Sequence, residues 1–277
     1  MIPAGFEYHR PADLSSAIDI LQKHGDEARV VAGGHSLIPM MKLRMADLGH
    51  LIDLQDIGDL KGIALESGSV TVGALVTQHE LITHDGLAKA LPILREAALQ
   101  IADPQVRYVG TVGGNVANGD PGNDMPGLMQ CLNATYHLTG PDGSREVAAR
   151  DFYEAAYFTA REDDEILTRI TIPLPAAGTG YAYAKQKRKI GDYATAAAAV
   201  LISDGSASIA MTNLSDTPIW SEAASAALAG GDVDGCVAAM LGDIDPQEDM
   251  RGPVAFKKHV AAVVLRRAVA SAQARRA

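Results

Sequence analysis

The chain has 277 residues, a formal net charge of −10 and 47% hydrophobic residues. This length suggests two or three domains, with enough apolar side chains to build a core. The negative charge argues against nucleic acid or an anionic membrane as the main partner. No apolar run reaches the length of a membrane span, and no basic stretch precedes an apolar one near the N-terminus. We therefore expect a cytoplasmic chain.

Residues 1–56 form the first predicted unit. A short strand over residues 6–8 precedes a helix that Asp13 or Ser15 can cap and that ends near Gly25. A buried strand over residues 29–32 then leads into a loop that contains two adjacent glycines. A further strand over residues 51–54 completes this unit.

Residues 57–176 form the second predicted unit, which mixes hairpins with helices. The turn residues and apolar runs predict two hairpins, a later strand and three helical stretches. The hairpin strands are expected at 63–65 with 70–72 and at 136–139 with 145–148, the later strand at 165–173, and the helices at 77–82, 87–101 and 126–132. A Pro- and Gly-containing segment at 174–178 marks the expected domain boundary.

Residues 177–277 form the third predicted unit. Three strands are followed by three helical patterns, which together are typical of an α+β domain. The strands are expected at 181–187, 195–202 and 207–212, and the helices at 221–229, 235–241 and 254–274.

The C-terminal segment from Arg251 is basic, with seven basic and no acidic residues, so the remainder of the chain carries about −17. Two interpretations stay open. The basic residues either offset the negative end of a helix macrodipole, or form a docking surface for an acidic partner subunit.

Cysteines and histidines argue against two kinds of metal centre. Cys131 and Cys236 are the two cysteines, and both lie in apolar helical contexts, so we expect both to be buried. An iron–sulfur cluster normally takes four thiolates, so the chain should hold no cluster. His79 and His84 resemble a zinc-binding H-E-x-x-H pair but are one residue too far apart to share a helix face. The sequence predicts no metal site.

Two separated diglycine loops are the strongest functional signal. The first is Ala32-Gly33-Gly34-His35-Ser36, and the second is Thr111-Val112-Gly113-Gly114-Asn115. Each follows an apolar run, at 28–31 and at 106–109, which we interpret as a strand ending in a glycine turn. Glycine lets backbone N–H groups approach an anion, so the pair could hold the two phosphates of one dinucleotide. Neither a G-x-G-x-x-G after a strand nor a P-loop is found.

These loops resemble those of the FAD-binding medium subunits of molybdenum hydroxylases, in the vanillyl-alcohol-oxidase/p-cresol-methylhydroxylase (PCMH) superfamily. The resemblance runs from Tyr8 to Ala268, nearly the whole chain. Beyond the first loop, which continues to Pro39, it rests on runs at 102–108, 111–115, 118–126 and 183–194. The stretches 119–126 and 185–194 narrow it to the carbon monoxide dehydrogenase-like group. The implied fold is α+β: a two-subdomain PCMH-type FAD-binding fold, followed by a three-stranded antiparallel sheet with a helical cluster.

The resemblance also implies which residues bind FAD, in a non-covalent manner. The two loops should hold the pyrophosphate, while Asp124 accepts hydrogen bonds from ribose or backbone groups. Lys185 offsets phosphate charge or contacts the isoalloxazine, and Tyr193 lies against that ring. An alternative stays open for each of these three residues. Asp124 could instead be a turn residue, Lys185 could be a surface lysine, and Tyr193 could be a packing residue. The predicted FAD-binding residues are Ala32, Gly33, Gly34, His35, Ser36, Leu37, Thr111, Gly113, Gly114, Asn115, Asn118, Asp124, Lys185 and Tyr193. No catalytic residue is predicted, because FAD would carry the redox chemistry.

The implied activity belongs to a complex. A molybdopterin-containing large subunit would oxidise carbon monoxide with water to carbon dioxide at a molybdenum–copper site, and a small subunit would carry [2Fe–2S] clusters. Electrons would then pass through FAD on this chain to a quinone-type acceptor. The family resemblance implies a dimer of heterotrimers, either free in the cytoplasm or held at the inner face of the membrane through the complex.

Three alternatives remain. The chain could serve another molybdenum hydroxylase that acts on an N-heterocycle or an aldehyde, since the large subunit selects the substrate. It could be a stand-alone flavin oxidase, although the roughly 100 residues after Pro175 look too small for a substrate-binding cap. It could also be a nucleotide-binding scaffold without catalytic function.

Overall fold

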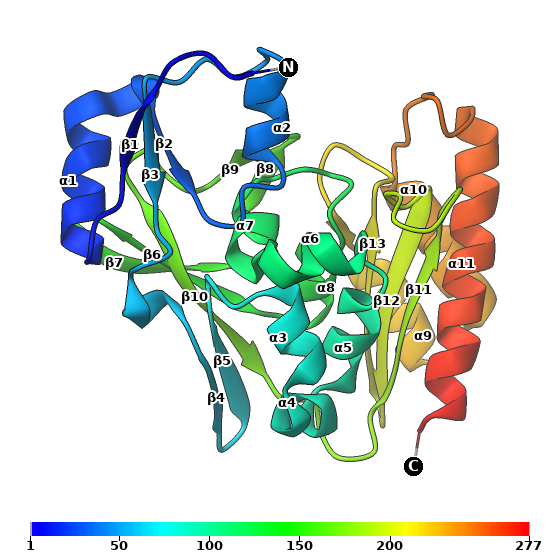
Figure 1. Cartoon of the computed structure of the whole chain (residues 1–277). Helices are drawn as coiled ribbons and strands as arrows, with labels where there is room; N and C mark the ends of the chain where they lie inside the picture. Colours follow the sequence, from blue (N-terminus) through cyan, green and yellow to red (C-terminus); the bar gives the residue numbers. More distant parts are fainter. Residues whose placement is uncertain (1, 277) are drawn as a thin grey trace.

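The computed structural model describes residues 2–276, and all statements below concern that range. The chain runs from an N-terminal unit, through a central group of short helices, to a C-terminal sheet covered by the longest helix (Figure 1). This mixed helix-and-sheet architecture confirms the predicted α+β class.

The N-terminal sheet is parallel and has the order β1-β3-β2. Its strands are β1 (Glu7–His9), β2 (Ala28–Val31) and β3 (His50–Asp53). Helix α1 (Leu14–His24) begins at Asp13, whose carboxylate accepts the N–H of Ser16 at 2.8 Å, and so confirms the predicted cap. Its buried face packs against the sheet, in one apolar cluster with Ile52.

The central unit contains an antiparallel sheet in the order β4-β5-β10-β6-β7. Both predicted hairpins and the later strand are present. The bounds are β4 (Ile63–Glu66), β5 (Ser69–Gly73), β6 (Thr135–Gly140), β7 (Gly143–Ala148) and β10 (Ile166–Pro173). Short helices pack beside this sheet: α3 (Gln78–Thr83), α4 (Asp85–Ala90), α5 (Pro92–Ala98), α6 (Pro104–Val109), α7 (Val112–Ala117) and α8 (Asp124–Cys131).

The strand expected at 106–109 is wrong. These residues belong to α6, because Asp103 accepts the N–H of Val106 at 3.0 Å and Pro104 occupies the first helical turn. The second diglycine is likewise not a turn after a strand. It lies in the first turn of α7, for which Thr111 is the N-cap. Local capping therefore outweighed the β propensity of a short apolar run.

Other differences are smaller. The helix expected over 87–101 is divided at Pro92, which lacks an N–H and starts the new helix α5. Several short elements were not predicted: helix α2 (Leu37–Lys42), 3₁₀ turns at Gly25–Glu27 and Gly58–Leu60, and strands β8 (Tyr153–Ala155), β9 (Phe158–Thr159) and β14 (Ile219–Trp220). Strand β14 adds a fourth, two-residue strand to the expected three-stranded C-terminal sheet.

That C-terminal sheet lies between two helical layers. It contains β11 (Gly180–Gln186), β12 (Ala196–Ser203) and β13 (Ser206–Thr212), covered by α9 (Glu222–Ala229), α10 (Val233–Asp243) and α11 (Val254–Ala274). Helix α8 packs against the opposite face. The sequence of strand β12 explains how helices can cover both faces of the sheet. Ala197 and Ala199 face the central core, while Ala198 and Val200 face the C-terminal helices. Small side chains let both layers approach the strand closely.

The basic C-terminal residues are largely paired within the chain. Arg251 and Lys257 contact Asp249, and Arg275 donates to Glu96 at 2.6 Å. Arg266 and Arg276 pair with Asp234 and Asp204. These carboxylates of the same chain neutralise much of the segment's charge, which leaves less of it for an acidic partner.

The cysteine prediction is confirmed, since Cys131 and Cys236 are both buried and unbridged. In addition, none of the helices within residues 2–276 combines the length and the apolar character needed to cross a membrane.

We propose to keep the predicted division at 1–56, 57–176 and 177–277. Each segment supplies all the strands of its own main sheet. Residues 1 and 277 themselves lie outside the described range.

Candidate functional site

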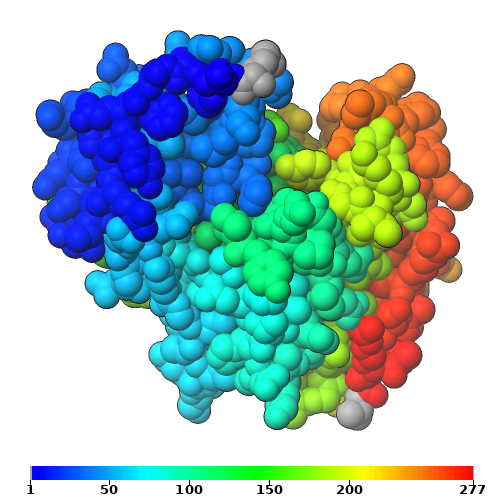
Figure 2. Space-filling model, viewed as in Figure 1, coloured from blue at the N-terminus to red at the C-terminus, as the bar shows by residue number. Residues whose placement is uncertain are grey.

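A cavity of about 580 Å³ opens between the N-terminal, central and C-terminal units. Figure 2 shows the surface hollowed between the blue N-terminal residues and the yellow and orange C-terminal region. The structure brings all fourteen predicted FAD-binding residues, Ala32 to Tyr193, into the lining of this one cavity. Their contact with FAD stays a prediction.

The first diglycine loop presents a row of unused hydrogen-bond donors. Within the described residues, the backbone N–H groups from Gly33 to Leu37 have no acceptor in the chain. Backbone N–H groups are rarely left unpaired unless water or a ligand satisfies them. Five consecutive donors at the edge of a cavity therefore suit an anionic group such as a pyrophosphate.

Glycine is required in this loop for two different reasons. A Cβ at Gly33 would lie 2.3 Å from the carbonyl oxygen of Val109, so only glycine lets the two loops approach each other. Gly34 has φ of 72°, a left-handed conformation that side chains disfavour. The loop then enters α2 through the bond from the N–H of Ile38 to the carbonyl of Gly34, at 3.0 Å.

The second loop uses its N–H groups internally. The Gly113 N–H donates to the carbonyl of Ala74 at 2.9 Å, and the Gly114 N–H donates to the Thr111 hydroxyl oxygen at 3.0 Å. A Cβ at Gly113 would lie 2.6 Å from Ala74, so this glycine serves close packing rather than anion binding. The expectation that both loops offer N–H groups in the same way is therefore wrong for Gly113 and Gly114.

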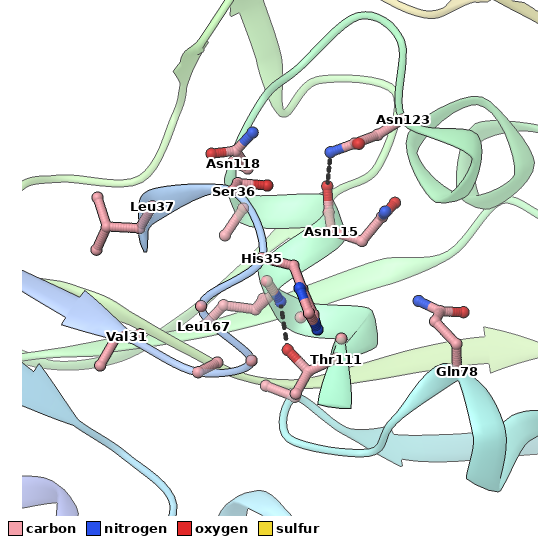
Figure 3. A pocket seen from close by; sticks show the side chains of 18 of the residues that line it. Val31, His35, Ser36, Leu37, Gln78, Thr111, Asn115, Asn118, Asn123 and Leu167 are labelled. Atoms are coloured by element: carbon pink, nitrogen blue, oxygen red, sulfur yellow. Dashed lines mark hydrogen bonds between the residues drawn. The ribbon is translucent and has the colours of Figure 1, made fainter. Parts of the chain in front are cut away.

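Side chains of the second loop reach toward the cavity instead. Thr111, Asn115 and Asn118 lie around it, facing the loop that carries His35 and Ser36 (Figure 3). Asn123 donates to the backbone carbonyl of Asn115 at 2.8 Å and so fixes the start of the following helix. The Asn115 side-chain oxygen accepts the N–H of Met125 at 3.2 Å, which leaves its amide nitrogen as a donor.

Asp124 and Lys185 form a buried ion pair at the cavity wall. The Lys185 Nζ lies 2.7 Å from Asp124 Oδ2, and their side chains are 1% and 5% exposed. Tyr183 donates its hydroxyl to the other carboxylate oxygen at 2.5 Å. Burial raises the pKa of Asp124, while Lys185 and Tyr183 act in the opposite direction. Asp124 thus accepts hydrogen bonds from Lys185 and Tyr183 of this chain, and Lys185 is not a surface lysine. The contact of Asp124 with ribose stays a prediction.

Tyr193 and His35 complete the rim. Tyr193 is 42% exposed and packs against Gly122, where a Cβ would lie 2.7 Å from the ring. His35 is exposed toward the cavity, on the glycine loop.

Gln78 is a lining residue that the sequence interpretation missed. It is 2% exposed, and neither its amide nitrogen nor its amide oxygen has a hydrogen-bond partner among the described residues. Thr77 and Glu80 form the capping box that starts α3, which makes a helix predictable here, but this signal does not reveal that Gln78 lies at the cavity (Figure 3).

The donor set fits a dinucleotide. Unpaired N–H groups in the first loop match phosphate oxygens, and the unpaired Gln78 amide and the Thr111 hydroxyl can bond further polar atoms. The lining also contains apolar residues, among them Val31 and Leu37, as expected for a cofactor that is part flat ring and part polar chain.

Comparison with known families supports the same interpretation. Residues 4–175 match the family described as the FAD binding domain in molybdopterin dehydrogenase, and residues 181–272 match the CO dehydrogenase flavoprotein C-terminal domain. The carbon monoxide dehydrogenase medium chain of Afipia carboxidovorans is 56% identical, over 99% of each chain. That of Hydrogenophaga pseudoflava is 42% identical, over 99% of each chain.

Solved structures show the same fold. A structure titled reconstituted CO dehydrogenase from Oligotropha carboxidovorans matches with a TM-score of 0.97 and 57% identity, covering 99% of this chain and 100% of the other. Quinoline 2-oxidoreductase from Pseudomonas putida 86 matches with a TM-score of 0.93 and 31% identity, over 99% of each chain. The chain therefore belongs to the family of FAD-binding medium chains of molybdopterin dehydrogenases, and FAD is its cofactor.

Proposed function

We propose that this chain is the FAD-carrying electron-transfer subunit of an aerobic carbon monoxide dehydrogenase. The observation that carries the proposal is the end-to-end similarity to carbon monoxide dehydrogenase medium chains, at 56% identity over 99% of each chain. The overall reaction is oxidation of carbon monoxide and water to carbon dioxide, with two electrons and two protons released.

The residues of this chain bind and position the cofactor. The N–H groups from Gly33 to Leu37 would hold the pyrophosphate, and Thr111, Asn115 and Asn118 would add side-chain hydrogen bonds from α7. Tyr193 would shield the ring system. Bound FAD supplies the redox chemistry, accepting electrons from one partner and passing them to another.

Electrons have to reach this chain from other polypeptides. The sequence has two cysteines, Cys131 and Cys236, which are both buried, whereas an iron–sulfur cluster normally takes four thiolates. We propose that a [2Fe–2S] small subunit donates the electrons and that a molybdopterin-containing large subunit carries out the oxidation.

We further propose a dimer of heterotrimers and a quinone-type acceptor. Quinones dissolve in membranes, so the assembled complex would work in the cytoplasm and contact the inner face of the membrane.

A second candidate is a medium subunit for a different substrate. Quinoline 2-oxidoreductase matches over 99% of this chain at 31% identity, so the same fold also occurs in an oxidoreductase that acts on an N-heterocycle. The sequence identity to quinoline 2-oxidoreductase, 31%, is lower than the 56% identity to a carbon monoxide dehydrogenase medium chain, which favours carbon monoxide as the substrate.

Reconstitution tests the proposed function. The chain is mixed with its large and small subunits, and carbon monoxide-dependent quinone reduction is followed. We expect activity only with all three chains. Equal quinone reduction without this chain would overturn its role as electron carrier, whereas activity on an N-heterocycle but not on carbon monoxide would overturn only the substrate.

The unpaired Gln78 amide gives a separate prediction. We expect Gln78→Met to weaken FAD binding about tenfold, because a hydrogen bond of roughly 1.5 kcal/mol would be lost. The FAD-free variant should nevertheless be more stable than the FAD-free wild type, since two buried, unpaired polar atoms are removed. FAD titration and thermal unfolding of the FAD-free proteins measure the two effects.

Gln130 provides the matched control. It is 4% exposed, its side-chain oxygen also lacks a partner among the described residues, and it does not line the cavity. Gln130→Met should leave FAD affinity unchanged. Equal FAD affinity in Gln78→Met and wild type would contradict the assignment of Gln78.

A further inference from the structure

Three histidines from three different elements meet at the edge of the N-terminal sheet. His9 ends β1, His24 ends α1 and His50 begins β3. One ring nitrogen from each lies within 4.8 Å of the others. His9 Nε2 is 3.0 Å from His50 Nδ1, and the rings of His24 and His50 have centroids 3.5 Å apart. Among the histidines, the prediction that the chain has no metal site weighed only the spacing of His79 and His84, and so did not consider this cluster.

The fold rather than the sequence spacing creates the cluster. Strands β1 and β3 pair in parallel, with Glu7 opposite His50 and His9 two residues farther along. Side chains two apart on a strand share a face, so Glu7, His9 and His50 lie on one side of the sheet. Helix α1 packs against the sheet with its C-terminal residue His24 beside them.

The surroundings suit a cation. The His24 side chain is half-buried beside the His50 ring, and imidazole nitrogens are the commonest metal ligands in proteins. The Glu7 carboxylate lies 3.6 Å from His50 Nδ1 and 3.9 Å from His9 Nε2. The C-terminal end of α1 adds the partial negative charge of the helix dipole.

We propose that His9, His24 and His50 bind a divalent transition-metal ion, Zn²⁺ or a close equivalent, with Glu7 as a fourth ligand. Nitrogens bound tetrahedrally to Zn²⁺ at about 2.0–2.1 Å lie about 3.3 Å apart. The His9 and His50 nitrogens share a hydrogen bond at 3.0 Å, so a bound ion would replace this bond and move the two rings apart by a few tenths of an ångström. Imidazole ligands favour Zn²⁺ and its neighbours over Mg²⁺ and Ca²⁺, which prefer oxygen.

The site is structural and separate from the FAD cavity. His50 pairs with Ala28 at the start of β2, whereas the first glycine loop follows Val31 at the other end of that strand. A bound ion would link β1, α1 and β3. It should therefore stabilise the N-terminal unit without changing FAD content.

Zinc binding to the full-length chain tests the proposal. Protein stripped with EDTA is dialysed against Zn²⁺, and bound metal, FAD content and thermal unfolding are measured. We expect one equivalent in the wild type, with a rise in melting temperature of roughly 5–10 °C at free Zn²⁺ about 100 times the Kd. Mg²⁺ should give no rise. His24→Gln and His9→Gln should each weaken binding at least about tenfold, with FAD content unchanged.

His259→Gln is the control, because His259 is an exposed histidine on α11. It should bind Zn²⁺ as the wild type does. Two results would each overturn the proposal: failure of the wild type to bind one equivalent, or an undiminished affinity in both His24→Gln and His9→Gln. Two separate variants are used so that misfolding of one leaves the other to decide.

Discussion

Gly114→Val is expected to weaken FAD binding about 100-fold or more. Gly114 is exposed to the cavity, and a Cβ there would lie 2.9 Å from the Thr111 hydroxyl oxygen and 3.8 Å from Ala32 Cβ. A valine would therefore displace the Thr111 cap and fill the gap between the two loops. We expect the variant to lose about two hydrogen bonds to the pyrophosphate, one from the displaced Thr111 side chain and one from the first loop. At roughly 1.5–3 kcal/mol for each bond to a charged group, this loss gives the expected magnitude.

FAD titration of the flavin-free variant measures this effect, and circular dichroism reports whether the fold is kept. Gly242→Val is a matched control, because nothing lies within 4 Å of a Cβ at Gly242 in α10. An FAD affinity equal to that of wild type in Gly114→Val would show that the second loop does not border the cofactor.

Lys185→Met is expected to destabilise the protein by about 3–5 kcal/mol at neutral pH. The substitution leaves the Asp124 carboxylate buried without its cation, and breaking a buried ion pair in this way costs that amount. For a chain of this size the melting temperature should fall by roughly 10 °C. Arg188→Met is the control: its partner is Asp192, and Arg188 is 43% exposed, so its pair should contribute about 1 kcal/mol or less.

The loss of stability in Lys185→Met should become smaller as the pH falls. The pKa of Asp124 is already raised by burial, and loss of Lys185 should raise it further. A carboxyl with a raised pKa in the folded state stabilises the fold below the unfolded-state pKa, and this stabilisation is lost as the pH rises through the folded-state pKa. Lys185→Met should therefore approach the wild-type stability as the pH falls.

The double variant Asp124→Asn/Lys185→Met tests the same cause independently. It removes both charges and should recover a large part of the loss. If the double variant is as unstable as Lys185→Met, or if the deficit of Lys185→Met does not change with pH, then the unpaired carboxylate is not the cause.

Local signals made much of the fold predictable. Asp13 before an amphipathic run, and the turns at Gly68 and Gly143, each act over a few residues and were interpreted correctly. The apolar run at 106–109 was not, because four residues carry no clear period and the deciding cap, Asp103, lies before them. Short segments of this kind depend on their caps more than on their composition.

The sequence predicted which residues line the binding site but not which of their side chains contact one another. Family resemblance selected fourteen residues, and the structure places every one at the same cavity. It did not reveal that Lys185 holds Asp124, or that Gln78 keeps an unpaired amide. Both facts depend on which side chains meet after folding.

The sequence by itself determined the glycine loops, the caps, the alternation of strands and helices and the family, because these depend on backbone preferences and on motifs only a few residues long. The tertiary structure alone decided which N–H groups stay free, since Gly113 loses its own to the carbonyl of Ala74 while the loop after Val31 keeps its own. It also decided the pairing of Asp124 with Lys185 and the meeting of His9, His24 and His50. Such contacts join residues distant along the chain, and only the packing of sheets and helices sets their distances.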